Sequence, residues 1–252
     1  MGDLLDALGI LDRRARRLAG PSIWLAFAAA MLLIATGQAC LERQLGVPGS
    51  GMVVTVAIAW AAWTTWHSIA FPRNRRRHLG GGPHPYRSAF VLDIFPGIAI
   101  GFSQMLRPVL NGAVLAGDTV PFGAAGPPLV LQAIGLALLA CAGVTFVAAW
   151  RTLGTARVGF VDEYRDPDGF VPERRGIYGH VRHPLFWSGA VASGALAMLV
   201  GSPTGYAIAG VNLAYAVAYN RLEDRRLRLV YGSSYAGYAA EVAAILPRRR
   251  SV

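Results

Sequence analysis

Long runs without charged side chains alternate along the chain with short arginine-rich segments. Four runs contain no formally charged residue: 18–41, 44–72, 119–150 and 183–220. A helix of about 20 mainly apolar residues is long enough to cross the hydrocarbon core of a bilayer. The pattern therefore predicts an all-α integral membrane protein and excludes a soluble globular domain.

The runs predict about six transmembrane segments, with a kink at Pro96 in the third. The expected segments are 22–41, 52–71, 89–106, 128–150, 184–200 and 204–220. As a single helix, the last charge-free run would be about 57 Å long, nearly twice the hydrocarbon thickness. The sequence Gly-Ser-Pro-Thr-Gly at 201–205 interrupts it, so we expect the last two segments to form a tight helical hairpin.

The N-terminal residues have a different pattern. Leu4, Leu5, Leu8 and Leu11 recur at helical spacing within residues 3–12, and arginines follow them. An apolar stripe beside a basic segment is typical of a helix that lies in the membrane interface. We therefore expect residues 1–20 to form an interfacial amphipathic helix on the cytoplasmic leaflet.

The charged residues predict the orientation in the membrane. All 24 basic side chains are arginine, and the net charge is +10. With six spans, 22 of the 24 arginines fall on one side, and only Arg43 and Arg107 fall on the other. Cytoplasmic loops are enriched in basic residues, so we expect both termini in the cytoplasm, with a bacterial plasma membrane as the location.

A charge of +10 also has the sign that nucleic acid requires. Its distribution assigns it to topology and to anionic lipid instead. The expected partner is the lipid bilayer, and no nucleic acid is expected.

Polar residues gather at both ends of the predicted hairpin. Tyr178, Arg182 and His183 precede it, and Arg221 and Glu223 follow it. Because a hairpin brings its two ends together, these side chains should face one another at the cytoplasmic boundary. Such a cluster of mixed charge at the membrane is a candidate functional site; the alternative is that the arginines are only positive-inside anchors.

Metal chemistry is not supported by the histidine pattern. His180 and His183 are three residues apart without further ligands nearby, and His67 stands alone at the end of a span. We therefore expect no metal. Asp93 is expected to pair with an arginine or to reach the membrane interface. The sequence leaves open whether His67 and Asp93 line a ligand pocket.

The stretch from about 170 to 247 carries a series of ordered motifs. They are Gly176-Ile177-Tyr178, Arg182-His183-Pro184, Phe186, Glu223-Asp224, Leu227, Tyr231-Gly232, Tyr235, Tyr238 and Leu246-Pro247. In this order, around an apolar hairpin, they resemble the C-terminal core of the isoprenylcysteine carboxyl methyltransferase superfamily. Trp66 to Ala70, with Arg87-Ser88, is more loosely similar to the NnrU-like and methanethiol S-methyltransferase branches.

The resemblance implies a membrane methyltransferase that uses S-adenosylmethionine. It places the cofactor on Phe170, Val171, Pro172, Glu173, Tyr178, His183, Pro184, Leu185, Phe186 and Glu223. The catalytic residues it implies are Arg182, His183, Arg221 and Glu223. Tyr219 and Arg221 would contact the acceptor. Tyr219 stands where carboxyl methyltransferases have arginine, and Phe186 where the family often has tyrosine, which argues against a prenylcysteine carboxylate.

The chain then divides into the N-terminal helix at 1–20, a four-span region at 21–150, and a catalytic core at 151–252 with a cytoplasmic C-terminal helix. We expect methyl transfer at the cytoplasmic face to a small lipophilic or lipid-like carboxylate or thiol. Such acceptors need no strong general base. The alternatives are a phospholipid amine, for which only His183 or Glu223 would serve as base, and a non-catalytic binding or transport protein of the same fold.

Overall fold

The computed structural model describes residues 2–82, 84–111, 127–165 and 171–244. Within these ranges the chain is helical apart from turns, short loops and one isolated bridge between Val181 and Ala243. The helices are α1 (Gly2–Ala7), α2 (Arg13–Gln44), α3 (Gly49–Thr64), η1 (Thr65–Ile69), α4 (Phe71–Leu79), α5 (Pro85–Ala89), η2 (Phe90–Ile94), α6 (Phe95–Met105), α7 (Arg107–Val109), α8 (Leu129–Leu153), α9 (Thr155–Val158), α10 (Asp162–Arg165), η4 (Gly176–Gly179), α11 (Pro184–Val200) and α12 (Pro203–Glu241).

Four helical segments are long and apolar enough to cross a membrane. They are Arg17–Gln44, Gly49–Ile69, Pro85–Met105 and Leu129–Leu153. They fit an integral membrane protein, and each contains most of one of the first four segments expected from the sequence. The fifth expected segment corresponds to α11, which is apolar but only 17 residues long, and the sixth is the first part of α12.

The last two helices form a hairpin at Gly201. This glycine ends α11 in the left-handed conformation (φ 74°), which side chains other than glycine rarely adopt. Ser202 then caps α12 by accepting a hydrogen bond from the backbone N–H of Gly205. Helix α12 continues for 39 residues, well past the expected span, and its backbone breaks at Gly232.

The N-terminal segment corrects the expectation of one interfacial helix over residues 1–20. Helix α1 ends at Ala7, Gly9 has a positive φ of 77°, and α2 already begins at Arg13. Leu4 and Leu8 are buried against protein, in a cluster with Tyr86, Ile94, Val161 and Tyr164. Three of the four leucines of the stripe therefore pack onto the protein, whereas Leu11 is exposed.

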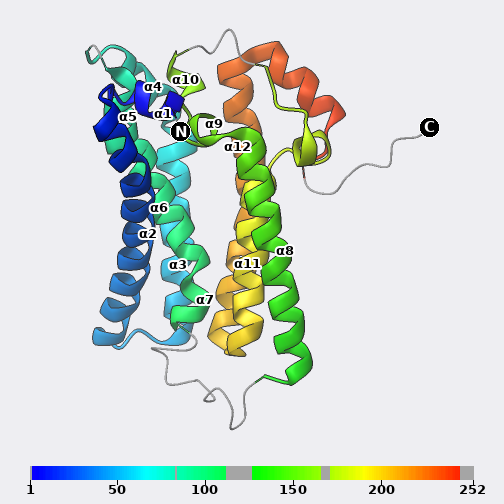
Figure 1. Ribbon diagram of the computed structural model, residues 1–252. Helices are drawn as coiled ribbons and strands as arrows, with labels where there is room; N and C mark the ends of the chain where they lie inside the picture. The colour runs from blue at the N-terminus through cyan, green and yellow to red at the C-terminus, as the bar shows by residue number, and fades with distance from the viewer. Residues whose placement is uncertain (1, 83, 112–126, 166–170, 245–252) are drawn as a thin grey trace, which may run out of the picture.

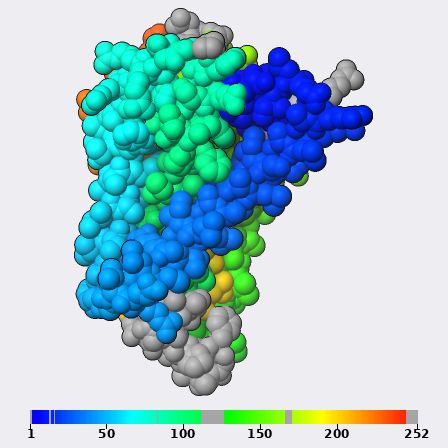
Figure 2. Space-filling view, turned by 90° about the vertical axis from the view of Figure 1, so that its left-hand side faces the viewer, coloured from blue at the N-terminus to red at the C-terminus, as the bar shows by residue number. Residues whose placement is uncertain are grey.

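The long helices stand side by side, with α2, α3 and α6 next to the group of α8, α11 and α12 (Figure 1). Figure 2 shows α2 running obliquely across one face from the end that carries α1. Helix α1 and the C-terminal part of α12 lie at the same end of the bundle (Figure 1). This arrangement places the short helices α4, α5, α9 and α10 around that end as well.

At the opposite end lies a largely buried polar cluster, here called the distal lock: Gln38, Glu42, Gln104, Arg107 and Asn111. Glu42 forms an ion pair with Arg107 and accepts hydrogen bonds from Gln38 and Asn111, both at 3.2 Å. Gln104 donates to Gln38 at 3.2 Å. The sequence pattern predicted only that Arg107 lies on the outer side of the membrane; its side chain is fully buried. The lock fixes α2 against α6 and α7.

Candidate active site

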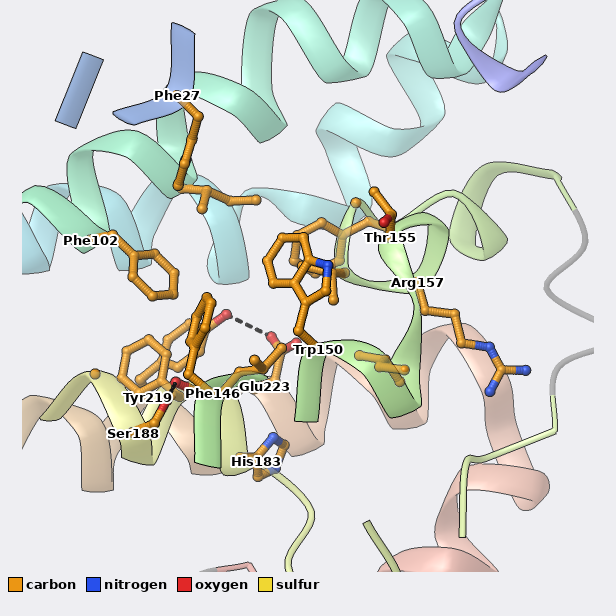
Figure 3. A pocket seen from close by; sticks show the side chains of 18 of the residues that line it. Phe27, Phe102, Phe146, Trp150, Thr155, Arg157, His183, Ser188, Tyr219 and Glu223 are labelled. Carbon is orange, nitrogen blue, oxygen red and sulfur yellow. Dashed lines mark hydrogen bonds between the residues drawn. The ribbon is translucent and has the colours of Figure 1, made fainter. Parts of the chain in front are cut away.

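A cavity of about 600 Å³ lies between the two groups of helices. This volume is within the range of small-molecule sites. Most of its wall is aromatic or aliphatic, and its aromatic side chains include Trp24, Phe27, Phe95, Phe102, Phe146 and Trp150. Figure 3 shows Phe102, Phe146 and Trp150 around the open space next to Tyr219 and Glu223.

The polar residues of the cavity come from two stretches of the chain. The segment from α9 to the start of α11 and the middle of α12 supply Arg157, Asp162, Glu163, Glu173, Tyr178, Arg182, His183, Tyr219, Glu223 and Arg226. All of them lie in or near the end of the bundle that carries α1. The cavity is therefore amphiphilic, with an apolar body and a charged end, here called the polar end.

Glu223 is held by two neighbours on the same face of α12. Tyr219 donates a hydrogen bond to it at 2.9 Å. Arg226 donates from Nε at 2.8 Å and from a terminal nitrogen at 2.5 Å. Residues three and four apart lie on one face of a helix, so the spacing of 219, 223 and 226 creates this arrangement. Although burial alone would raise the pKa of Glu223, the guanidinium of Arg226 lowers it.

The same guanidinium also forms an ion pair with Glu163 of α10. Arg226 and Glu163 are almost fully buried, with side-chain exposures of 1% and 2%. One cation therefore lies between two carboxylates. Burial raises the pKa of Glu163 to about 7; the nearby charge of Glu223 adds to this rise and Arg226 opposes it.

The segment that carries Glu163 is positioned by the N-terminal half of the protein. Arg75 of α4 donates from Nε to the Glu163 carbonyl at 2.7 Å. Tyr86 of α5 donates to the carbonyl of Gly159 at 2.7 Å. Both contacts are made to backbone oxygens, so the side chain of Glu163 remains directed to Arg226.

Asp224 organises a second polar group behind Glu223. Arg182 donates to both of its oxygens, at 3.2 and 2.5 Å, and His183 Nε2 lies 2.8 Å from Oδ1. Tyr235 donates to the same carboxylate at 2.5 Å. Although burial alone would raise the pKa of Asp224, the hydrogen bonds from His183 and Arg182 hold it below the usual range of aspartate.

Arg182 has a further structural role. Besides pairing with Asp224, it donates to the carbonyls of Ala239, at 2.8 Å, and of Val242. It therefore joins the loop before α11 to the C-terminal end of α12. The sequence predicted a catalytic role for Arg182. In the structure, most of its N–H donors are used in these contacts, which hold two parts of the chain together.

The approach segment before η4 brings Glu173 to the cavity. Its carboxylate accepts two hydrogen bonds from the Arg175 side chain, both at 2.9 Å, and these lower the pKa of Glu173 to about 2. Tyr178 is buried, and its carbonyl accepts a hydrogen bond from Tyr238 at 2.8 Å. Glu173 is thus a charged side chain at the cavity wall.

Most of the residues that the sequence predicted for the site line this one cavity. They are Pro172, Glu173, Tyr178, Arg182, His183, Leu185, Phe186, Tyr219 and Glu223. Arg221 is exposed and is not among the lining residues, and Val171 is also exposed. Pro184 is buried in the first turn of α11, outside the lining. Phe170 lies outside the described residues, and the individual roles of all of these stay predictions.

Sequence reasoning missed Glu163 and Arg226. Arg226 was accessible from helical spacing, because it stands three residues after Glu223. Glu163 has no such signal, since its partner is 63 residues away in the chain.

The two polar residues whose roles the sequence left open, His67 and Asp93, both lie in π-helical turns. π-Helical turns often mark functional positions. His67 is buried and stacks on Trp63, which lines the cavity, with ring centroids 5.1 Å apart. Asp93 lies 2.5 Å from His78 Nε2 and 3.8 Å from Arg77. In the part of the chain that the structure describes, no cluster of three or more histidine, cysteine or acidic residues is arranged to hold a metal ion.

The structure is thus an apolar helical bundle with an amphiphilic cavity, and it fits an integral membrane protein. Residues 130–234 match the sequence model of a family described as phospholipid methyltransferase. These are 105 of the 252 residues, and they include α10, η4, α11 and the polar part of α12. Comparisons with curated proteins and with solved structures gave no significant match.

Proposed function

We propose that the protein is an S-adenosylmethionine-dependent methyltransferase that acts within a membrane on a lipid-like acceptor. The observation that carries this proposal is the cavity: the segment similar to phospholipid methyltransferases supplies nearly all of its polar end. Its aromatic body suits an apolar chain, and its polar end suits the cofactor and a headgroup.

The residues at the polar end fit the chemical groups of S-adenosylmethionine. A ribose diol and an ammonium group both require carboxylates, and Glu173 and Glu223 provide two. An adenine requires an apolar or aromatic wall, which Leu185 and Phe186 offer beside Tyr178. The cofactor supplies an activated methyl group on a sulfonium. The protein then has to position the acceptor and exclude water, and the largely apolar wall of the cavity suits both tasks.

The charges around the cavity favour an amine over an anionic acceptor. Among the described residues, each arginine that lines the cavity is paired with a carboxylate: Arg157 with Asp162, Arg182 with Asp224, and Arg226 with Glu163 and Glu223. The acids that line the cavity, Asp162, Glu163, Glu173 and Glu223, outnumber these three arginines, so a carboxylate or thiolate would meet an excess of negative charge there. We accordingly favour an amine headgroup, the alternative that the sequence had left open, over a carboxylate or thiol.

The proposed route for the acceptor runs laterally between α2 and α8. Side chains of both helices line the cavity, and both helices are candidate membrane spans. Trp24 of α2 and Trp150 of α8 meet edge to face, with centroids 4.5 Å apart. A lipid tail would lie among the aromatic residues, with the headgroup at the polar end. The asymmetry of the arginines supports a cytoplasmic position for that end.

Calorimetric titration with S-adenosylhomocysteine tests the cofactor assignment. The detergent-purified wild type should bind it, and Glu223→Ala should bind about 10- to 150-fold more weakly, since a lost hydrogen bond to a charged group costs about 1.5–3 kcal/mol. Glu223→Gln keeps the side-chain volume and should also be weakened, whereas Glu241→Ala, at an exposed position, should bind like the wild type. Absence of binding by the wild type, or equal binding by all four proteins, contradicts the proposal.

The acceptor is tested with a labelled methyl donor and membrane extract. Label in phospholipid supports the amine, label in a base-labile ester indicates a carboxylate, and label in a volatile thioether indicates a thiol. Binding of the cofactor without any transfer to these acceptors would instead favour a non-catalytic binding protein.

A further inference from the structure

Glu163 lies between two cavities. It lines the large cavity and also a second one of about 10 Å³, which has room for about one water molecule. The small cavity is bordered by His67 and Asp93, and His67 Nε2 and Asp93 Oδ1 make no hydrogen bond within the described residues. Glu163 thus connects the polar end with a separate set of buried polar atoms.

Glu163 is also bound by fewer hydrogen bonds than Glu223. Glu223 accepts three hydrogen bonds from Tyr219 and Arg226. The ring of His183 is bonded to Asp224. The carboxylate of Glu163 is held by one terminal nitrogen of Arg226, a cation that it shares with Glu223.

The charged and titratable groups around Glu163 come from every neighbouring element. On α12 these are Arg226, Glu223 and Tyr231; Arg75 lies on α4, Tyr86 on α5 and Tyr164 on its own helix, α10. His67 and Asp93 face it across the small cavity. In this set a single guanidinium, that of Arg226, forms ion pairs with two carboxylates, and a proton on Glu163 relieves the excess negative charge.

Methylation of an amine requires a group on the protein that first removes a proton from that amine. A lipid amine is an ammonium ion near neutral pH, like the lysine side chain, and it has no lone pair for attack. A carboxylate must first take one proton, breaking an N–H bond and forming an O–H bond. The nitrogen lone pair then forms the N–C bond, the S–C bond breaks, and its electron pair stays on the sulfur. The product is a methylated ammonium ion, a neutral thioether and one proton on the carboxylate.

We propose that Glu163 is the group that takes the proton from the acceptor amine. This inference rests on the proposed function, with an amine as acceptor. It differs from the assignment implied by the sequence, where only His183 or Glu223 was available as base.

The test compares two acceptors with the wild type, Glu163→Gln and Glu163→Asp. One is a phospholipid with an ordinary primary amine, and the other has an amine whose pKa is brought below 7 by neighbouring fluorine atoms. With the ordinary amine at neutral pH, Glu163→Gln should lose about 100-fold in kcat, a typical effect of general base catalysis. With the fluorinated amine, already unprotonated, the loss should fall to about fivefold or less.

Two further readouts separate chemistry from structure. The kcat of the wild type with the ordinary amine should rise with pH and level off once Glu163 has lost its proton near neutrality. In Glu163→Gln this levelling should vanish, and kcat should keep rising as the amine itself loses its proton. Glu163→Asp should recover part of the rate. Glu241→Gln, the same change at an exposed glutamate, should match the wild type, and binding of S-adenosylhomocysteine reports whether each variant is folded.

The possible failures are distinguishable. If the kcat of Glu163→Gln falls by the same factor with both amines, or if the variant keeps the pH dependence of the wild type, Glu163 is not the proton acceptor. The proposed function then still stands. If the wild type methylates neither amine but transfers to a carboxylate or thiol, the amine acceptor itself is wrong, and this inference falls with it.

Discussion

The two ends of the helical bundle each contain a buried arginine with carboxylate partners, but they are built differently. In the distal lock, Arg107 meets a single acid, Glu42, and amide side chains supply further hydrogen bonds to that acid. At the polar end, Arg226 meets two acids, Glu163 and Glu223, beside a cavity of about 600 Å³. A balanced, enclosed pair maintains structure, whereas an unbalanced cluster open to a cavity can change its protonation during a reaction.

The largest expected effect is on stability, in the distal lock. Replacing Arg107 by Met leaves Glu42 buried without its cation, and removing one partner of a buried pair costs about 3–5 kcal/mol. Denaturant titration in detergent should show this loss for Arg107→Met and less than about 0.5 kcal/mol for Arg43→Met, where the side chain is exposed. The double variant Glu42→Leu/Arg107→Met should recover much of the loss. If the single Arg107 variant is as stable as the wild type, the lock has no structural role.

The next largest effect concerns Asp224, which joins Arg182, His183 and Tyr235. Replacing it by Asn should cost about 1.5–3 kcal/mol, as expected for hydrogen bonds to a charged group. The pKa of Asp224 is lower in the folded protein, so its contribution is present above the unfolded pKa of about 4 and is lost as the pH falls. Thermal unfolding between pH 3 and 7 should therefore decline at the acid end more steeply in the wild type than in Asp224→Asn. Parallel curves would contradict this role.

A smaller effect is expected in the apolar body of the cavity. Ala192 of α11 lines it, whereas the neighbouring Val191 is exposed on the outside of the helix. Ala192→Phe should fill space intended for a lipid tail and lower kcat/KM for a long-chain acceptor by about tenfold, equivalent to about 1.4 kcal/mol. A short-chain acceptor and S-adenosylhomocysteine should be affected less than about threefold. Val191→Phe is the matched control, and an equal loss in both variants would place the tail elsewhere.

The same two ends show what could be predicted from the sequence. Charge-free runs of about 20 residues predict spans because each helix satisfies its backbone hydrogen bonds by itself. The full length of α12 was not predicted, since the helix continues after the apolar run ends at Asn220. The burial of Arg107 was not predicted either. Its partner Glu42 is 65 residues away, and no local pattern reveals such a pair.

At the polar end, the hairpin argument predicted that the two ends of the hairpin meet. Tyr178, His183 and Glu223 do line one cavity, whereas Arg221, predicted with them, does not. Glu163 was missed because its position depends on contacts of the loop backbone with Arg75 and Tyr86. These contacts form only when the N-terminal half packs against the segment that carries Glu163, so the spacing of residues along the sequence does not reveal them.

The smallest expected effect is at Arg221. The motifs predict that this arginine is catalytic and contacts the substrate, whereas the helical geometry places it outside the cavity. On a helix, residues two apart point to opposite sides, while residues three and four apart share a face. Tyr219 and Arg226 therefore accompany Glu223 in the cavity, and Arg221 is exposed. Arg221→Gln should change kcat and KM by less than about twofold, whereas Arg226→Gln, which leaves two acids without their cation, should lose about 100-fold or more in kcat/KM. A tenfold or greater loss of kcat/KM in Arg221→Gln would show that Arg221 contacts the substrate. Helix α12 would then have to rotate or unwind near Glu223 when the acceptor binds.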